Sequence, residues 1–303
     1  MLVMGITSGC DAQVKTTAEA PAQVTDPERF ADYWYAGKAE LSRYRLTQMR
    51  YDQPRNGEVV LVYVTEDFLP ERQVKDERGS EGAVKVLKLN AMKKFETGIY
   101  DYSLMTSVFT PVDYRKSPYT LKVTFGAQDW CGQSFSQVNL RDRTLEYEHR
   151  SYFESEGDAN ETREATYFEE DLWTRMRLEP QMLPLGEVEI IPSLEFLRLN
   201  HLTYRPQAAK AVLLLQVDDK GGETYVYKLE YTDIGRKMTW RCESQFPYRL
   251  LGWEEEVKDG NGAWRKTKAT RTHQVMDRYW ERNSIADAPL RDSLGVRFGL
   301  GEE

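Results

Sequence analysis

Cysteine and histidine are both scarce in this chain. Its 303 residues include 3 Cys and 3 His, which are too few and too scattered for most metal or thiol chemistry. A Gly-rich phosphate loop, a Gly-x-Ser-x-Gly elbow, a His-Glu-x-x-His pair and a Cys-x-x-Cys pair are all missing. These absences favour a protein without catalytic activity, and we expect neither a cofactor nor a metal ion.

Long apolar runs and an excess of positive charge are missing too. No stretch of about 18 apolar residues occurs, so no segment is predicted to span a membrane. The 41 Lys and Arg residues are outnumbered by 49 Asp and Glu residues, and the resulting net charge of −8 disfavours nucleic acid or an anionic membrane as a partner. A charged fraction of 30% and a hydrophobic fraction of 40% are typical of a globular protein.

The N-terminal segment 1–9 is apolar and uncharged, and it ends in Thr-Ser-Gly before Cys10. Small residues before a cysteine are typical of a bacterial lipoprotein signal, in which that cysteine becomes the lipidated first residue. No Lys or Arg precedes Cys10, and nine residues cannot hold both a charged region and a full apolar region, so we interpret the segment as a truncated signal. The alternative is an ordinary short N-terminus with a chance Gly-Cys pair.

Residues 11–25 are rich in Ala, Gln, Thr and Pro, and they show no apolar periodicity. This composition is typical of a flexible tether. Together, 1–25 predict a lipid anchor at Cys10 followed by a tether, which places the protein in the cell envelope. We expect an outer-membrane lipoprotein whose domain lies on the periplasmic or the surface face and touches the bilayer only through its lipid.

Strand signals dominate the remaining residues 26–303. Apolar and polar residues alternate with period two in 119–127, 145–153, 223–232 and 237–246, which predicts half-buried strands. The segments 59–64 and 212–215 are apolar on both faces, so they are expected to be central strands covered on both sides. Turn residues at 218–222 and 259–262 predict antiparallel hairpins.

Two short helices complete the predicted fold. A helix is predicted over 27–36, because Pro27 suits the first turn and Phe30 and Trp34 share one helical face. The spacing of Leu172 and Met176 predicts another helix within 168–178. The second helix belongs to a bridge, 159–184, between two halves of a single domain, about 26–158 and 185–303. The predicted fold is mainly β with a minor α component: a curved antiparallel sheet of hairpins, half-barrel-like, with a few short helices packed on it.

Four stretches carry a family resemblance: YWYAGKAE at 33–40, MTSVFTP at 105–111, DWCG at 129–132 and SYFESEGD at 151–158. With them the chain resembles, over nearly its whole length, an uncharacterised family of lipoproteins from Bacteroidota-type bacteria. Members often carry the name septum formation inhibitor Maf. Genuine Maf proteins are cytoplasmic nucleotide pyrophosphatases with a Ser-x-Ser-Pro-Arg-Arg motif, and the only Ser-Pro pair here, at 117–118, is followed by Tyr119 and Thr120. The resemblance therefore implies an envelope lipoprotein and not Maf chemistry.

Cys131 and Cys242 are the cysteines that remain if Cys10 carries lipid. In an exported protein an even number of cysteines favours a disulfide, which would close a long loop. The alternative is two separate buried thiols, each close to a Trp, that act as small apolar side chains. Both interpretations are open at this point.

Glu154, Glu156 and Asp158 form the one acidic cluster that resembles a catalytic site. Carboxylates two residues apart lie on one face of a strand, where they shift each other's pKa and divide acid and base roles. The competing interpretation is a solvated strand end that runs into a turn. His149, on an apolar strand face, is interpreted as a hydrogen-bonded core residue. The acidic residues 254–256 face basic residues across a predicted hairpin, which indicates solvated charge pairing.

Aromatic residues are abundant, with 18 Tyr, 7 Trp and 11 Phe. Most should be core, but a curved sheet with aromatics on its concave side also makes a groove for an apolar or glycan ligand. Our leading hypothesis is a non-enzymatic, envelope-anchored lipoprotein that binds a ligand or a protein partner. The alternatives are a carboxylate-dependent hydrolase that acts on glycan or lipid, and a purely structural envelope component.

Overall fold

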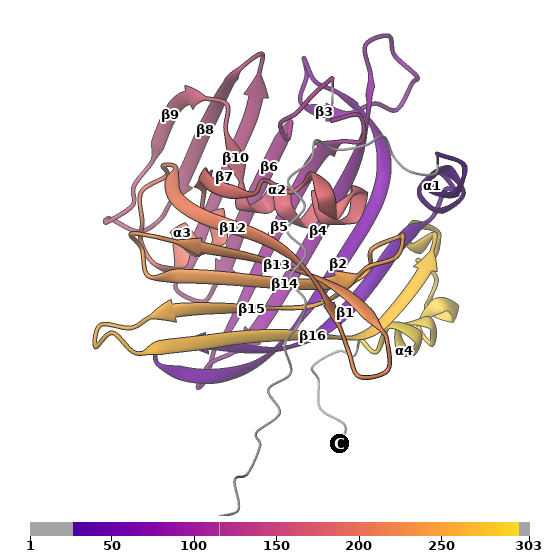
Figure 1. Ribbon diagram of the computed structural model, residues 1–303. Coiled ribbons are helices and arrows are strands. Elements are labelled where there is room, and N and C mark those ends of the chain that lie inside the picture. The colour runs from indigo at the N-terminus through magenta and orange to yellow at the C-terminus, as the bar shows by residue number, and fades with distance from the viewer. Residues whose placement is uncertain (1–26, 115, 297–303) are drawn as a thin grey trace, which may run out of the picture.

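The computed structural model describes residues 27–114 and 116–296, and in these the protein is one large sheet that is antiparallel except for one short parallel pair at its edge, 167–168 with 190–191 (Figure 1). The predicted lipid-anchor residue Cys10 and the predicted tether lie outside the described residues. The sheet is strongly curved but not closed into a barrel, and the predicted mainly β fold is confirmed. Among the described residues, no helix has the length and apolarity needed to cross a bilayer.

The strands and helices follow one another mostly as hairpins. The first half contains α1 (Pro27–Trp34), β1 (Ala39–Arg50), β2 (Gln53–Leu69), β3 (Val74–Lys75), β4 (Val84–Glu96), β5 (Asp101–Pro111), β6 (Lys122–Asp129), β7 (Gly132–Arg141), β8 (Thr144–Ser151) and β9 (Ala159–Glu164). A helical bridge and the second half follow: β10 (Tyr167–Phe168), α2 (Glu169–Leu178), η1 (Pro180–Met182), β11 (Gly186–Ile191), α3 (Leu194–Leu199), β12 (Gln207–Val217), β13 (Glu223–Tyr231), β14 (Arg236–Glu243), β15 (Leu250–Lys258) and β16 (Trp264–Asp277). The short elements η2 (Tyr279–Glu281), η3 (Ile285–Asp287) and α4 (Leu290–Leu294) end the described chain.

The strand order in space joins the two halves at the middle of the sheet. It runs β10-β11-β12-β13-β14-β15-β16-β1-β2-β4-β5-β6-β7-β8-β9, and β3 pairs only with β2. The first strand, β1, therefore lies between β2 and the last strand, β16. Figure 1 shows that β4 to β9 and β12 to β16 lie on opposite sides of α2, with their strands crossing steeply. The concave faces of the two halves therefore face each other across α2.

Alternation of inward and outward residues builds the core. Val59 and Leu61 of β2 are buried in the main core, whereas Val62 faces the other way and packs in a second cluster with Leu294 of α4. The prediction of a strand covered on both sides is therefore correct for 59–64. It is wrong for 212–215, because the outward side chain of Val212 is 41% exposed and no described element covers it.

The local predictions agree with the structure at the hairpins and helices. The expected strands are found as β6, β8, β13 and β14, and the expected helices as α1 and α2. Both predicted turns are stabilised by an aspartate at their start. Oδ1 of Asp218 accepts hydrogen bonds of 2.8 Å from the backbone N–H groups of Lys220 and Gly222, and Asp259 binds the equivalent groups of its own turn. The helical bridge predicted over 159–184 is found only from β10 onward, because 159–164 form β9, a strand of the first half that pairs with β8.

Helix α2 lies between the two halves, and every residue of it except Trp173 is buried. Charged pairs attach it on both sides. Arg177 binds Glu40 of β1, with 2.6 Å between Nη2 and Oε2, while Glu169 binds Arg236 of β14, with 2.7 Å between Oε1 and Nη2. Buried charges are retained only when they are paired in this way, since an unpaired one is costly. The helix is therefore fixed relative to both halves of the sheet.

Candidate functional site

A cavity of about 250 Å³ lies inside the curved sheet, against α2 and α3. Strands β1, β2, β4 and β5 of the first half line it, and so do β14, β15 and β16 of the second half. Neither half alone would enclose this space. Cavities between packed layers are the usual location of small-molecule sites.

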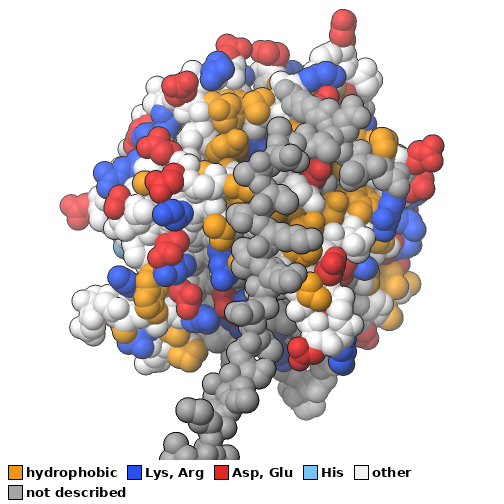
Figure 2. Space-filling view, in the orientation of Figure 1, with side chains coloured by type: hydrophobic (Ala, Val, Ile, Leu, Met, Phe, Trp, Pro, Cys, Tyr) orange, Lys and Arg blue, Asp and Glu red, His pale blue; other side chains and the backbone are white. Residues whose placement is uncertain are grey.

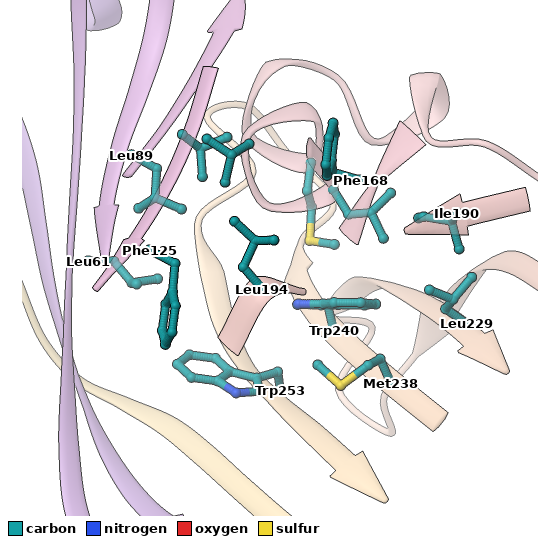
Figure 3. Packing of buried hydrophobic residues seen from close by; sticks show 14 of the residues in the cluster. Leu61, Leu89, Phe125, Phe168, Ile190, Leu194, Leu229, Met238, Trp240 and Trp253 are labelled. Atoms are coloured by element: carbon teal, nitrogen blue, oxygen red, sulfur yellow. The ribbon is translucent and has the colours of Figure 1, made fainter. Parts of the chain in front are cut away.

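Apolar side chains of the strands and of α2 form one part of the cavity wall. They include Val59, Leu61, Leu89, Val108, Trp173, Met238 and Trp253. In Figure 3, Leu61 and Leu89 lie on one side, Met238 and Trp253 lie on the other, and Leu194 stands between them. Apart from Trp173, these lining residues are all buried from solvent. The cavity is therefore suited to an apolar group.

Glu170, in the first turn of α2, is the most unusual polar group of the wall. Its Oε1 accepts a hydrogen bond of 2.7 Å from the backbone N–H of Leu194, while its Oε2 is buried without a hydrogen-bond partner. Burial raises the pKa of Glu170 to about 8, and the neighbouring carboxylate of Glu169 acts in the same direction. At neutral pH this carboxyl is therefore mostly protonated, and it is a hydrogen-bond donor.

The other charged groups of the interior are paired. Arg236 donates to Glu169 and, over 2.7 Å, to Glu255, and its guanidinium lies 4.0 Å from the centre of the Phe196 ring. Tyr231 donates to the same Glu169 over 2.6 Å. Each of these three charged side chains, Glu169, Arg236 and Glu255, therefore has a partner of opposite charge.

A second polar group of contacts lies on the α3 side of the cavity. Lys93 of β4 forms an ion pair with Glu195 of α3. Gln48 accepts from Lys93 over 3.4 Å, and it donates to the Thr267 hydroxyl over 3.2 Å. These contacts connect β4, β1 and β16 to α3, and they form a second polar part of the cavity wall.

The mouth of the cavity is marked by exposed lining residues. Tyr51 and Asp52 form the turn between β1 and β2, and both have left-handed backbone conformations, with φ of 54° and 57°. Tyrosine is rarely found in such a turn, where Asn or Gly is preferred. The Arg50 guanidinium lies 4.6 Å from the centre of the Tyr51 ring and donates to the carbonyl of Leu199 over 2.7 Å. These contacts hold an aromatic ring at the entrance.

The predicted acidic cluster is not brought together. Glu154 is exposed, and Asp158 is exposed beside Arg150. Only Glu156 turns inward, into a separate polar pocket of about 170 Å³. The cause is local: β8 ends at Ser151, so the two-residue period of a strand no longer applies to the loop that follows.

Inside that pocket the Glu156 carboxylate has four partners. It lies 3.0 Å from Nη1 of Arg198 and 2.7 Å from Nδ1 of His201, it accepts from the Ser151 hydroxyl over 2.7 Å, and it lies 3.4 Å from Nε2 of His149. Although burial acts to raise it, the pKa of Glu156 is lowered by the Ser151 hydrogen bond, the Arg198 charge and the histidines. Glu156 therefore acts as an ionised tie between the loop 152–158 and α3.

Ser136, His149 and Glu156 form a chain of contacts that resembles a hydrolytic triad. The Ser136 hydroxyl lies 2.8 Å from Nδ1 of His149, which confirms His149 as a hydrogen-bonded core residue. However, Ser136 sits within β7, paired with both β6 and β8, so its backbone N–H belongs to the sheet. A nucleophile needs free donors that stabilise an oxyanion, and this position offers no such pair. The geometry favours a structural role.

The two cysteines within the described residues, Cys131 and Cys242, are free thiols. Cys131 is exposed at the turn between β6 and β7, and Cys242 is buried in β14. The disulfide alternative is therefore not realised in the structure, and the thiol alternative holds with one correction: Cys131 is not buried. Burial raises the pKa of the Cys242 thiol to about 12, which makes it unreactive.

Several residues of the main cavity could not be assigned from the sequence. Glu255 was grouped with its neighbours as a solvated charge, yet its side chain points inward to Arg236, while Glu254 and Glu256 face Lys266 outside. Because side chains alternate between the two faces of a strand, Glu255 must point to the face opposite that of Glu254 and Glu256, and this alternation could have predicted its inward direction. No comparable signal marks Glu170, because an acidic residue in the first helical turn is ordinarily solvated.

Comparisons with protein-family models, with curated proteins and with solved structures find no match to this chain. Within the described part of the chain, no group of three or more His, Cys, Asp or Glu side chains is arranged to hold a metal ion. The function is therefore argued from the cavity itself.

Proposed function

We propose that this protein binds a small amphiphilic molecule in the cavity between its two half-sheets and performs no chemistry on it. The observation that carries the proposal is a cavity between the two half-sheets, open at one mouth, whose wall combines apolar side chains with polar ones. The wall includes the Glu170 carboxyl, whose raised pKa favours the protonated form and whose Oε2 lacks a partner. An apolar body would be held by burial, and a single polar group would be oriented by the wall.

The size of the cavity limits the ligand. Its volume of about 250 Å³ lies just below the range of roughly 300–1,000 Å³ that is usual for ligand sites. We infer that the occupant is a small amphiphile or the end of a longer one. The mouth beside Tyr51 gives a longer molecule room to extend outward.

Binding is favoured over the two alternatives for physical reasons. A hydrolase of the predicted type needs Glu154, Glu156 and Asp158 at one cleft, and they point in different directions. A purely structural component would have a broad apolar surface without an internal cavity. The cavity between the half-sheets is therefore the feature that favours ligand binding. On the face seen in Figure 2, hydrophobic side chains form several separate groups among charged ones.

We further propose that the domain is held in the cell envelope by lipid on Cys10. The small residues before Cys10, the tether at 11–25 and the resemblance to envelope lipoproteins support this localisation. A net charge of −8 is unsuited to anionic lipid headgroups, so the anchor would rely on its acyl chains.

The test of the proposed binding is a titration with dansyl-labelled undecanoic acid, preceded by native mass spectrometry of the purified chain to find a retained ligand. Ala91→Phe fills the cavity from β4 and should weaken probe binding at least tenfold. Val212→Phe adds the same side chain at an exposed position and should leave binding unchanged. Equal binding by the wild type and Ala91→Phe, with both folded, would show that the cavity is not the site.

A further inference from the structure

Large apolar side chains are exposed at both ends of the sheet, and those toward the start of β1 include Tyr35, Tyr279 and Ile285. Five lie at the other end, each in or directly beside a hairpin turn or loop: Tyr51 (53% exposed), Ile99 (81%), Trp130 (74%), Tyr152 (77%) and Trp264 (41%). We call these five residues the aromatic rim. In an antiparallel sheet every second connection falls at the same end. The connections β1–β2, β4–β5, β6–β7 and β8–β9 therefore share an end, and the β15–β16 hairpin joins them because Lys268 of β16 pairs with Thr47 of β1.

Neighbouring turns of the aromatic rim contact one another. The Tyr100 hydroxyl donates to that of Tyr51 over 3.1 Å, which links the β4–β5 turn to the β1–β2 turn. The Tyr152 ring covers Gly132 so closely that a Cβ there would lie 2.8 Å from Cδ1 of the ring. This contact links the loop after β8 to the turn that carries Trp130. These contacts join the turns in two pairs, β1–β2 with β4–β5 and β6–β7 with β8–β9.

The aromatic rim borders the mouth of the main cavity. Tyr51 and Asp52 belong to the rim's first turn and also line the cavity, and Lys258 and Asp259 of the β15–β16 hairpin do the same. That hairpin projects at the left of Figure 1. A molecule that enters or leaves the cavity therefore passes the rim.

We propose that the aromatic rim docks on a zwitterionic lipid bilayer, so that an amphiphile passes between the membrane and the cavity. This inference rests on the proposed function. Tyr and Trp are the side chains enriched at membrane interfaces, because their rings are apolar and their tips form hydrogen bonds. They project from separate turns, which suits insertion between headgroups better than contact with a flat protein surface.

The charged residues of the rim turns indicate which lipid headgroup the rim can contact. The rim turns carry Arg50 and Lys258 but also Asp52, Glu154 and Asp259. Basic residues are therefore not concentrated here, and the whole chain is acidic, with a net charge of −8. Anionic lipid would be repelled or ignored, whereas a neutral headgroup layer carries no such penalty.

The proposed anchor has the reach that this orientation requires. Residues 11–26 separate Cys10 from Pro27, and these sixteen residues span at most about 55 Å when extended. Helix α1 precedes β1, whose far end carries Tyr51, and the 12 residues of β1 cover about 40 Å. The tether is therefore long enough for the rim to face the membrane that holds the lipid.

The test uses the full chain with Cys10→Ser, so that a lipid anchor cannot cause binding, and vesicles of pure phosphatidylcholine. The wild-type rim should co-sediment with the vesicles, and raising the salt concentration should have little effect. Ile99→Ser with Trp130→Ser removes two exposed rim side chains and should weaken the partition at least tenfold. Trp280→Ser is the matched control, since Trp280 is 46% exposed beyond the opposite end of β16 and should not matter.

The probe titration separates the two proposals. The rim variant should still bind the dansyl probe in solution, and Ala91→Phe should still bind vesicles. Absence of vesicle binding by the wild type, with probe binding intact, would overturn docking while the proposed function stands. Binding only to anionic vesicles, or self-association in ultracentrifugation that the rim variant abolishes, would also overturn it.

Discussion

The backbone N–H of Leu194 donates a hydrogen bond of 2.7 Å to Oε1 of Glu170, and this bond joins the start of α3 to the first turn of α2. The second oxygen of the same carboxyl has no partner. A buried acid that is half satisfied in this way favours the protonated form. The protonation of Glu170 therefore affects both the contact between α2 and α3 and the polarity of the cavity wall.

Glu170→Gln should change how stability depends on pH. Burial raises the pKa of Glu170 from 4.5 to about 8, so the folded state holds a proton that the unfolded state releases. Its contribution is complete below pH 4.5 and is lost as the pH rises to 8 and above, with a slope of up to about 1.4 kcal/mol per pH unit. Urea unfolding at pH 5, 7 and 9 should show a shallower decline for the Gln variant. Parallel curves for both proteins would contradict the raised pKa.

Glu156→Gln should destabilise the protein by about 1–2 kcal/mol at pH 7, because charged hydrogen bonds to Arg198 and His201 are weakened. Glu154→Gln, at an exposed neighbouring position, should have no measurable effect. The pKa of Glu156 is lowered from 4.5 in the folded state. The difference in unfolding free energy between the wild type and Glu156→Gln should therefore persist above pH 4.5 and shrink as the pH falls below 4.5. A difference that grows in acid would refute this assignment.

Arg177→Met should cost about 3–5 kcal/mol, because it leaves the Glu40 carboxylate buried without its cation. Adding Glu40→Gln should recover part of the loss, since the uncompensated charge is then removed. The exposed pair Lys210 and Glu187 offers the comparison: Lys210→Met should change the unfolding free energy by less than about 1 kcal/mol. Chemical unfolding of the wild type and these three variants decides between a buried and a solvated pair.

Thiol labelling should distinguish the cysteines. In a chain with Cys10→Ser, a thiol reagent should modify the exposed Cys131 quickly and Cys242 only after unfolding. Mass spectrometry of intact protein should show a single adduct under native conditions and two in denaturant. A chain with no reactive thiol until a reductant is added would instead contain the disulfide.

Strand positions could be predicted because the relevant signal is local. Alternation within β8, β13 and β14 shows which side chains face the core, and the aspartates at 218 and 259 mark their turns. The burial of Val212 was predicted wrongly, since an apolar outward face looks the same whether or not another element covers it. Coverage depends on distant parts of the chain.

The candidate site was harder to predict for the same reason. Helix α2 begins with acidic residues that would ordinarily be solvated, but both half-sheets close around it. Glu169 and Arg236, which meet there, are 67 residues apart. The apolar spacing within α2 is a short pattern that predicts a helix. A cavity lined by strands from both ends of the chain has no such short pattern in the sequence.

The pairing of β1 with β16 has a consequence for how the protein is made. The centre of the sheet joins residues more than 200 positions apart, such as Leu41 and Val275, so β1 has one open edge until the last strand arrives. Sheets with such distant pairings fold slowly, and open edges invite pairing with other chains. The cavity between the half-sheets cannot exist in a partly synthesised chain. We expect loss of β16 to yield insoluble protein and not a smaller folded domain.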